Sequence, residues 1–452
     1  MLRGPILIFV LGTLAGCGLQ TSGLGDAGAE DRGEVAPDAP PDGTNDGPTD
    51  GPDVGEDADT TPPDGPADTP DATDGPADEP LDEGPADVWP EGWLPGWERR
   101  VALAIDHGDV DEPLTDFPVL VHLGSSVGRG PDDVGFVFDE LPAAVDRRKL
   151  AVTIDDGVSG CPVEVERWDA AAREAWLWVR VPAVSADVDT VLYLYFDAAQ
   201  PDNEYDVGDP GMSAARRVWT NGYRLVFHMQ DDPDDGHVRD SSQYGNRGTR
   251  GATGNPHQVL EGRCGAALRW DGVGDGEFIR VEHSTSLDLG SAFTAELWVA
   301  YEKGRTPNDY ERMLTKKAAY TDLDGWEFSL ESGLDRYITT RGSSASGTSG
   351  IANVVASWAA GGWHHVAVFY DGSRARALVD GSTDDDVVIR EVEDNDRPLF
   401  VGRYGGSLIH RWFGLLDEIR LSDTVRSDAW VRASYESGRD DLVDFGSEET
   451  RF

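Results

Sequence analysis

The chain has 452 residues, with 38 Lys and Arg against 85 Asp and Glu, and a formal net charge of −47. Nucleic-acid recognition needs a basic surface, so this acidic excess argues against nucleic acid as a partner. Hydrophobic residues make up 39% of the chain and include 14 Trp, enough for a substantial core, whereas three Cys are too few for a disulfide scaffold.

Residues 1–17 have the features of an export signal. Arg3 supplies a positive start, and residues 5–14 are apolar but too short to span a bilayer as a stable helix. The sequence LAGC that ends at Cys17 resembles the bacterial lipobox, which implies that Cys17 is diacylated and becomes the mature N-terminus. Gly18 favours the outer membrane. We expect a lipid-anchored protein at the outer membrane or cell surface; an ordinary secretory signal is the alternative.

Residues 18–89 form a predicted linker. Positions 21–90 hold 13 Pro, 21 Asp and Glu and a single basic residue, Arg32. Such a segment cannot bury enough apolar surface to offset the entropy of ordering it. Like charges and proline keep it extended. We therefore expect a disordered acidic tether between the anchor and the folded part.

From about residue 90 the sequence has an all-β pattern. Short apolar segments alternate with period two between Gly, Asp and Pro, which is the strand signal. No strand–helix–strand rhythm is present, which argues against a parallel α/β sheet. One short helix is expected at 427–434, with Ser427 as N-cap. Two antiparallel β-sandwiches are the simplest architecture. The expected strands are 100–105, 117–123, 176–181, 191–196, 277–281, 293–299, 326–330, 364–370, 399–401 and 416–421, and either a strand pair or a strand with a turn is expected within 217–229.

A change of pattern near residue 230 predicts two domains, 90–230 and 231–446. Seven blocks of the second resemble, in order, a concanavalin-A-like/laminin-G-like module, which implies a jelly-roll sandwich. Blocks of the first resemble a bacterial domain of unknown function that often precedes such modules in secreted and surface proteins. The blocks are 240–248, 267–272, 293–299, 362–367, 370–372, 379–381 and 414–421 in the second, and 97–100, 116–123, 176–182, 192–196 and 218–229 in the first.

The resemblance also implies a structural calcium ion, because laminin-G-like relatives often bind calcium close to their terminal strands. Calcium prefers several oxygen ligands. Asp240 and Asn246 offer them from one loop, and Asp417 can meet Asp240 if the first and last strands are neighbours, as the resemblance implies. Alternatively, Asp240 caps a turn through backbone amides and Asp417 faces solvent.

Catalytic patterns are weak in the acid-rich strand 416–423. Asp417 and Ile419 share one face of that strand, and Glu418 lies on the other. Jelly-roll glycosidases place paired carboxylates on one face, two residues apart, and no Glu-x-Asp-x-x-Glu arrangement occurs in the second half. Glycoside hydrolysis is therefore not favoured, although a triad drawn from remote segments stays open.

Other candidate motifs also favour structural roles. His364 and His365 are adjacent on a predicted strand, so they point to opposite faces and cannot chelate one metal together. The Gly/Ser run 342–350 lacks the lysine and following helix of a phosphate loop. We expect it to be a mobile loop at one edge of the sandwich.

Cys161 and Cys264 lie one in each predicted domain. Export makes a disulfide between them chemically possible, and it would lock the two domains together. Two unpaired buried thiols are the alternative.

Aromatic residues near strand ends are candidates for stacking on sugar rings. Tyr404, in the sequence GRYGG, is the most loop-like of them. A place in the sandwich core is the alternative for each. The candidates are Trp326, Tyr337, Trp358, Tyr404 and Trp412.

A lipid anchor, an acidic spacer and two β-sandwiches without a recognisable catalytic set predict a displayed, non-catalytic binding module. The expected ligand is a carbohydrate or glycoprotein, for adhesion or polysaccharide capture, and this rests on fold analogy. A glycan hydrolase or lyase is the alternative from another class, and a structural envelope protein is the third. We expect the acidic surface to disfavour anionic polysaccharides unless divalent cations bridge them.

Overall fold

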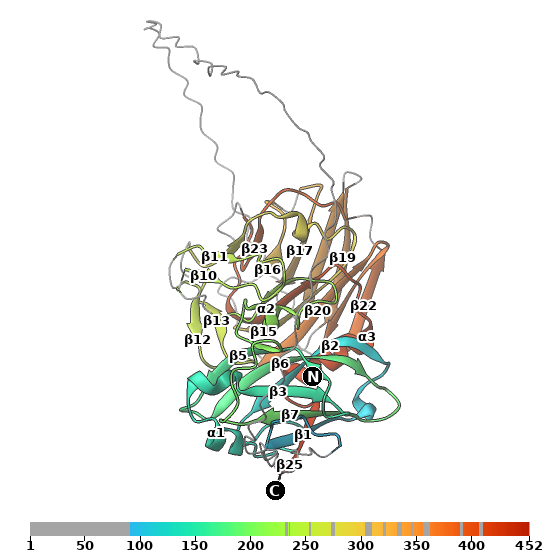
Figure 1. The fold of residues 1–452 in the computed structure, drawn as a ribbon. Coiled ribbons are helices and arrows are strands. Elements are labelled where there is room, and N and C mark those ends of the chain that lie inside the picture. Colours follow the sequence, from blue (N-terminus) through green and yellow to red (C-terminus); the bar gives the residue numbers. More distant parts are fainter. Residues whose placement is uncertain are drawn as a thin grey trace, which may run out of the picture. The chain divides into compact units, whose positions relative to one another are not determined.

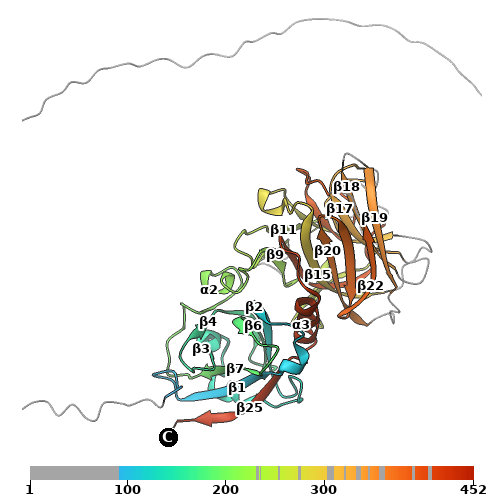
Figure 2. The ribbon, with the colours of Figure 1, turned by 90° about the vertical axis from the view of Figure 1, so that its right-hand side faces the viewer.

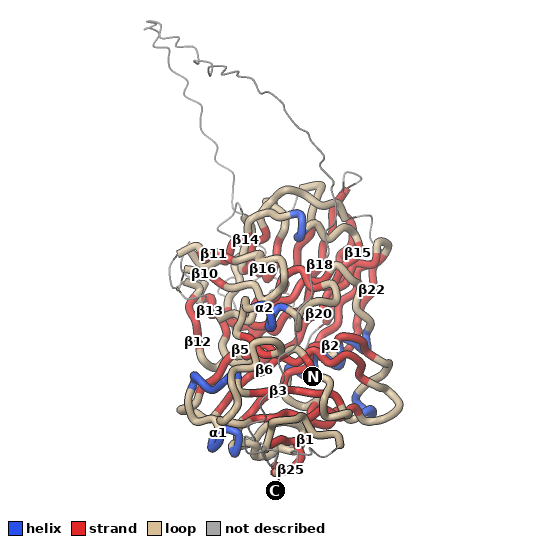
Figure 3. The backbone as a smooth tube through the Cα atoms, in the orientation of Figure 1, coloured by secondary structure: helices blue, strands red, loops and turns tan. Residues whose placement is uncertain are grey.

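The computed structural model describes residues 91–451, except 231–233, 235, 253–254, 273–275, 303–309, 320–321, 332–336, 345–346, 356–361, 389–391 and 406–409. The predicted linker and Cys17 lie outside these residues. Strands dominate and helices are short (Figure 3). The strands form several antiparallel sheets, so the predicted all-β class is confirmed. Among the described helices, none combines the length and apolar character needed to cross a membrane.

The first sandwich consists of a five-stranded and a four-stranded sheet (Figure 1). The five-stranded sheet has the order β25 (Val443–Thr450), β1 (Arg99–Ile105), β7 (Thr190–Phe196), β3 (Leu150–Ile154) and β4 (Gly160–Cys161). The four-stranded sheet has the order β2 (Leu114–Leu123), β6 (Glu174–Val184), β5 (Val163–Asp169) and β8 (Val207–Gly208). Burial alternates along β1, where Val101 and Leu103 enter the core. Val119 of β2 and Leu177 of β6 join the same buried cluster from the other sheet.

The second sandwich consists of two eight-stranded sheets (Figures 1 and 2). One has the order β10 (His237–Val238), β11 (Gly248–Arg250), β14 (Ile279–Val281), β23 (Leu399–Val401), β16 (Tyr310–Thr315), β17 (Trp326–Glu331), β18 (Tyr337–Ser344) and β19 (Gly347–Val355). The other has the order β12 (His257–Val259), β13 (Ala267–Trp270), β24 (Gly414–Ser422), β15 (Ala292–Tyr301), β20 (Trp363–Asp371), β21 (Arg374–Val379) and β22 (Ser382–Val388), and β9 (Tyr223–Phe227) pairs with β24. Phe293 and Leu297 of β15 pack against Phe328 of β17 in a second buried cluster.

The longest helix fills the junction between the two sandwiches. The helices are α1 (Phe136–Glu140), α2 (Ser213–Arg216) and α3 (Asp428–Gly438), with 3-10 turns η1 (His107–Asp109), η2 (Ala144–Arg148) and η3 (Thr285–Leu287). The predicted N-cap of α3 is confirmed, because Ser427 accepts a hydrogen bond from the backbone N–H of Trp430. Trp430 meets Phe117 of β2 edge to face at 4.8 Å. The hydroxyl of Ser437 accepts a hydrogen bond from the backbone N–H of Leu120, at 2.8 Å.

Strand pairing divides the chain differently from the predicted ranges 90–230 and 231–446. β9 ends before residue 230 yet pairs with β24 of the second sandwich, with Val226 opposite Arg420. β25 returns from the second sandwich to pair with β1, with Val443 opposite Ile105. The first sandwich therefore takes an edge strand from the C-terminal end of the chain, a pairing that alternation within a strand cannot reveal.

One local prediction was wrong. The Gly/Ser run 342–350 is not a loop, because β18 and β19 pair along most of it, with Gly342 opposite Ser349. Of the two alternatives for 217–229, a strand pair or a strand with a turn, the second is found, because a turn leads into the single strand β9. Pairing with a neighbouring strand supplies backbone hydrogen bonds that the composition of a segment does not predict.

Candidate functional site

The aromatic residues predicted to bind a ligand mostly belong to the core. Trp326, Tyr404 and Trp412 are 1%, 3% and 0% exposed, so the prediction that they stack on a sugar was wrong. The Tyr404 hydroxyl is enclosed, because Arg312 donates to it at 2.7 Å and it donates to Glu327. Large aromatic side chains gain most by burial, even next to a glycine-rich turn. The Tyr337 side chain and all of Trp358 lie outside the described residues.

Asp240 holds a turn. Its Oδ1 accepts from the backbone N–H groups of Val226 and Ser242, both at 2.9 Å, and its Oδ2 accepts from that of Asn246 at 2.6 Å and from the Ser242 hydroxyl at 2.8 Å. The Asn246 side chain donates to the Arg224 carbonyl at 2.7 Å. Burial raises the pKa of Asp240 despite these donors. Hydrogen-bond donors thus take up the oxygens that calcium would need.

Asp417 serves a different segment. Its Oδ2 accepts from the backbone N–H groups of Arg263 and Cys264, at 2.8 and 2.9 Å. Burial and the neighbouring Glu418 raise the pKa of Asp417 well above its usual range. Asp240 and Asp417 therefore bind separate stretches of backbone, and with Asn246 they do not fit a shared calcium site. Structural calcium elsewhere in the chain stays a prediction.

Both described cysteines are free, so the predicted Cys161–Cys264 disulfide was wrong. Cys161 lies in β4, and burial raises its pKa to about 12. Cys264 lies beside the end of α3, with its Sγ 3.7 Å from the carbonyl oxygen of Gly438. Both thiols are buried and unpaired, which is the alternative that the sequence left open.

His364 and His365 have different partners, as the strand geometry predicts. Nδ1 of His364 lies 2.6 Å from a carboxylate oxygen of Asp380. His365 is buried with its ring 5.2 Å from that of Trp298. Burial and the nearby Arg420 lower the pKa of His365 to about 3. The pair is therefore not a metal chelate.

An aromatic pocket of about 410 Å³ lies where the outer face of the sheet containing β15 and β20 meets the end of α3. Trp298 comes from β15, Trp363 begins β20 and Tyr435 belongs to α3. The rings of Trp298 and Tyr435 stack at 5.7 Å with an interplanar angle of 24°. Gly438 permits this approach, because a Cβ there would lie 2.6 Å from Nε1 of Trp298. The pocket is lined by Arg263, Trp298, Trp363, Tyr435, Arg439, Asp440 and Asp441.

Charged groups surround these rings. The guanidinium carbon of Arg263 lies 5.1 Å from the ring centre of Trp298. Arg439 forms ion pairs with Glu436, at 2.6 Å, and with Asp441. Asp440 lies 2.8 Å from Nδ1 of His122, a residue of β2. Aromatic faces framed by ionic and hydrogen-bonding groups suit a polar ligand that also has an apolar face.

The sequence carried one signal for this pocket. In β15, Phe293, Leu297 and Val299 face the core, so Glu296 and Trp298 occupy the outer face. A tryptophan on the polar face of an alternating strand marks a contact outside the sandwich core. The other lining residues come from segments far apart in the chain, and no local pattern connects them.

A second cluster is wholly buried where β5 of the first sandwich meets β9 and β24. Nδ1 of His228 lies 2.6 Å from Glu418 and 3.6 Å from Glu166, and its Nε2 lies 3.3 Å from Glu164. Glu418 also binds Arg420, at 2.6 Å. His228 and the four residues of its cluster are each less than a tenth exposed, so no substrate can reach them, and the cluster is a buried ionic contact between the two sandwiches. The four residues are Glu164, Glu166, Glu418 and Arg420.

The backbone at Glu418 and the pKa values of His228 and Glu166 are both consistent with this buried ionic contact. A β-bulge in β24 sets Glu418 at a φ of +49°, which is rare for a non-glycine residue. Burial opposes protonation of His228, yet the carboxylates of Glu418, Glu164 and Glu166 together raise its pKa well above its usual value. Burial raises the pKa of Glu166 to about 8. No local sequence pattern marks these residues, because their ionic partners are remote in the chain.

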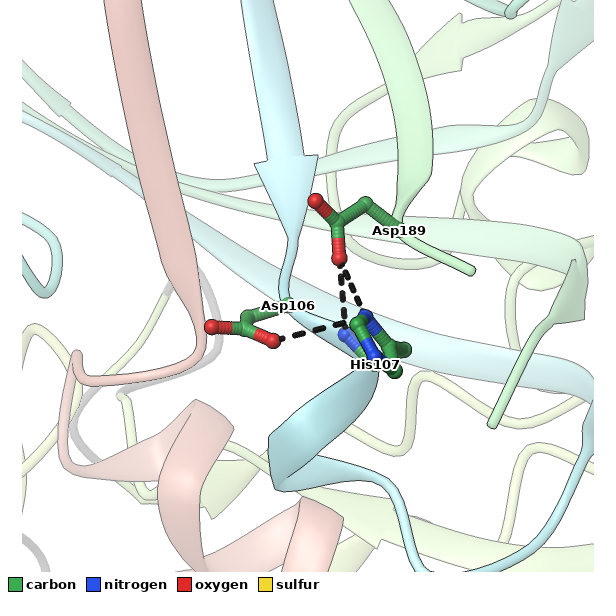
Figure 4. Close-up of side chains that lie close together, drawn as sticks. All are labelled: Asp106, His107 and Asp189. Carbon is green, nitrogen blue, oxygen red and sulfur yellow. Dashed lines mark hydrogen bonds and ion pairs between the residues drawn. The ribbon is translucent and has the colours of Figure 1, made fainter. Parts of the chain in front are cut away.

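A third group lies at the surface of the first sandwich (Figure 4). Nδ1 of His107 is 2.7 Å from Asp189 and 3.7 Å from Asp106. The hydrogen bond with Asp189 raises the pKa of His107. All three side chains are more than a third exposed, and Asp106 also pairs with Arg129, at 2.7 Å. Three ligand atoms from these residues could approach one cation, but the contacts are those of a solvated ion-pair network.

Three solved structures that are similar to part of this chain have low sequence identity to it. The binding domain of Paraclostridial Mosquitocidal Protein 1 gives a TM-score of 0.39 with 17% identity, covering 48% of this chain and 52% of that one. Domain 4 of AbnA, an extracellular arabinanase from Geobacillus stearothermophilus in complex with arabinotriose, gives 0.37 with 17% identity, covering 46% and 96%. The binding domain of botulinum neurotoxin serotype G gives 0.36 with 12% identity, covering 47% and 50%. This chain thus spans about half the length of the two toxin domains.

A comparison with curated proteins gives no match. One family model matches within the second sandwich, over residues 273–432, and it describes the concanavalin A-like lectin/glucanases superfamily. Trp298 and Trp363 fall inside the matched range, and β15, β20 and β24 form adjacent strands of one of its sheets. Residues 273–432 are therefore a concanavalin A-like lectin/glucanase domain.

Proposed function

We propose that this protein is an exported, lipid-anchored surface protein that binds carbohydrate, free or on glycoproteins, in the pocket of Trp298, Trp363 and Tyr435. The observation that carries the proposal is the combination in one pocket of stacked aromatic rings with arginine and aspartate side chains. Sugar rings stack their C–H faces on aromatic side chains, and their hydroxyls need charged or amide partners.

The size and layout of the pocket support a saccharide ligand. A volume of about 410 Å³ falls in the range of small-molecule sites, roughly 300–1,000 Å³. Trp298 is almost fully buried and forms the floor, whereas Trp363 and Tyr435 are half-buried and keep part of their surface open. Asp440 and Arg439 can hydrogen-bond ring hydroxyls from the rim. These features favour reversible binding.

The burial of the acid-rich strand supports binding rather than hydrolysis. Asp417 and Glu418 are 0% and 1% exposed, and their oxygens already accept hydrogen bonds or form ion pairs. A glycosidase acid must reach the glycosidic oxygen. The lipid anchor on Cys17 and the acidic linker would hold the binding domain away from the membrane, where it meets soluble or surface-bound glycans.

A glycan array tests the proposal. The purified full-length protein is applied with calcium and again with chelator, beside Trp363→Ala and the control Tyr205→Ala, which alters a tyrosine that is 76% exposed in the first sandwich. We expect the tryptophan variant to lose about tenfold or more in affinity, because a central aromatic anchor dominates a small site, and the control to bind normally. Wild-type silence, or loss only in Tyr205→Ala, would refute the assigned site. Loss of binding in chelator would support the predicted calcium.

A further inference from the structure

We infer that the pocket selects sugars carrying an anionic group, and that Arg263 is the residue that recognises it. The inference rests on the proposed function, because it names the ligand class of the same site. It goes against the expectation from total charge, under which a chain of −47 repels anionic glycans.

Arg263 differs from the other charged groups of the pocket in having no ionic partner. Arg439 is neutralised by Glu436 and Asp441, and Asp440 faces His122. Within the part of the chain that the structure describes, no carboxylate lies within ion-pair distance of Arg263, and its Nε is buried without a hydrogen-bond partner. A half-buried, unpaired guanidinium costs free energy that an anionic ligand would recover.

The backbone fixes Arg263 in place before any ligand arrives. Its N–H donates to Asp417 at 2.8 Å, together with that of Cys264. Two residues further on, the Gly265 carbonyl accepts from Arg167 of β5 at 3.1 Å. Contacts from both sandwiches thus hold the segment, so binding need not order it, which favours affinity.

The side chain of Arg263 is oriented as well. Its guanidinium lies over the ring of Trp298 at 5.1 Å, a cation–π contact that holds the side chain at the pocket. The planar fork of arginine matches the two oxygens of a carboxylate, and a lysine lacks that match. A uronic-acid carboxylate is therefore the favoured group, and a sugar sulfate is the other anion of suitable shape.

Long-range repulsion does not prevent this recognition. Charges beyond about 8 Å are largely screened at physiological ionic strength. A contact inside a half-buried pocket is screened much less. The attraction of Arg263 for an anionic group in the pocket therefore outweighs the repulsion from distant carboxylates. Acidic glycans should therefore bind in the absence of divalent cations.

The test uses the full-length protein in chelator at physiological salt. The probes are the uronate-bearing and sulfated glycans of the array, each with its neutral counterpart (carboxyl-reduced or desulfated). We expect the wild type to bind the best acidic glycan about tenfold or more tightly than its counterpart, as for other charge-assisted hydrogen bonds. Arg263→Met should remove this preference, so that the acidic glycan and its neutral counterpart bind with similar affinity. Arg263→Lys should keep part of it.

Arg280→Met is the matched control, because Arg280 lies on β14 in the other sheet of the second sandwich and pairs with Glu282 at 2.5 Å. Equal binding of acidic and neutral glycans, or an unchanged preference in Arg263→Met, would overturn the inference and leave the proposed function standing. Binding of no glycan in chelator would overturn the inference, and binding of none with calcium either would overturn the proposed function as well. Comparing the affinities for the uronate-bearing and the sulfated glycans identifies which anionic group the pocket prefers.

Discussion

Nδ1 of His228 lies 2.6 Å from Oε1 of Glu418, and this buried ion pair links β9 to the bulge of β24. Glu164 and Glu166 of β5 face the same imidazole. The first sandwich is therefore joined to the second through charges shielded from water, where electrostatic interactions are strongest.

We predict that stability falls as pH rises from about 5 to 8. The folded-state pKa of Glu166, about 8, and that of His228 are both raised. The folded protein therefore holds protons that the unfolded chain releases, and stabilisation present at low pH is lost as pH rises through the folded pKa values. For one proton the slope reaches about 1.4 kcal/mol per pH unit. Glu166→Gln should flatten it. Urea unfolding at several pH values measures the free energy of unfolding, and Glu282→Gln, which alters an exposed residue, is the control. If the free energy of unfolding depends on pH in the same way in the wild type and in Glu166→Gln, the prediction is contradicted.

Glu418→Ala should destabilise the protein by about 3–5 kcal/mol, because it leaves His228 and Arg420 buried without their carboxylate. The free energy of unfolding from urea titration at pH 6 measures the loss. In a protein that already carries His228→Ala, Glu418→Ala should lower the free energy of unfolding by less, because one of the two cations that Glu418 binds is already absent. Additive effects of the two substitutions would show that the pair is not coupled.

Gly438→Ala should weaken glycan binding and stability together. Its Cβ would lie 2.6 Å from the Trp298 indole, and overpacking of this kind costs about 1–3 kcal/mol. Gly446→Ala is the matched control, since the nearest atom to its Cβ would be 3.4 Å away. Thermal unfolding and the glycan array report the two effects. A Gly438→Ala protein that binds normally would show that Trp298 is not the floor of the site.

In a Cys17→Ser variant, thiol reagent should find no reactive cysteine in the folded protein and two after denaturation without reductant. Both remaining thiols are buried and free, and the raised pKa of Cys161 suppresses the thiolate that reacts. Finding no thiol after denaturation would reveal the disulfide that the structure lacks.

The same variant tests the anchor. Wild-type protein expressed in a bacterium should partition into detergent with the membrane fraction, whereas Cys17→Ser should stay in the aqueous phase, because the proposed acyl chains would attach to that sulfur. Equal partitioning of the two proteins would exclude Cys17 as the lipid attachment site.

The sequence by itself determined the all-β class, most strands and the cap of α3, since alternation and capping are properties of neighbouring residues. It also identified Asp240 as a turn residue among the alternatives. Only the tertiary structure decided which strands pair, and hence that β25 completes the first sandwich. It also decided which tryptophans are buried, and it gathered Arg263, Trp298, Trp363 and Tyr435 into one pocket. The physical reason is that burial and charge pairing depend on partners that packing brings from distant segments, whereas alternation records only that each strand has a face to bury.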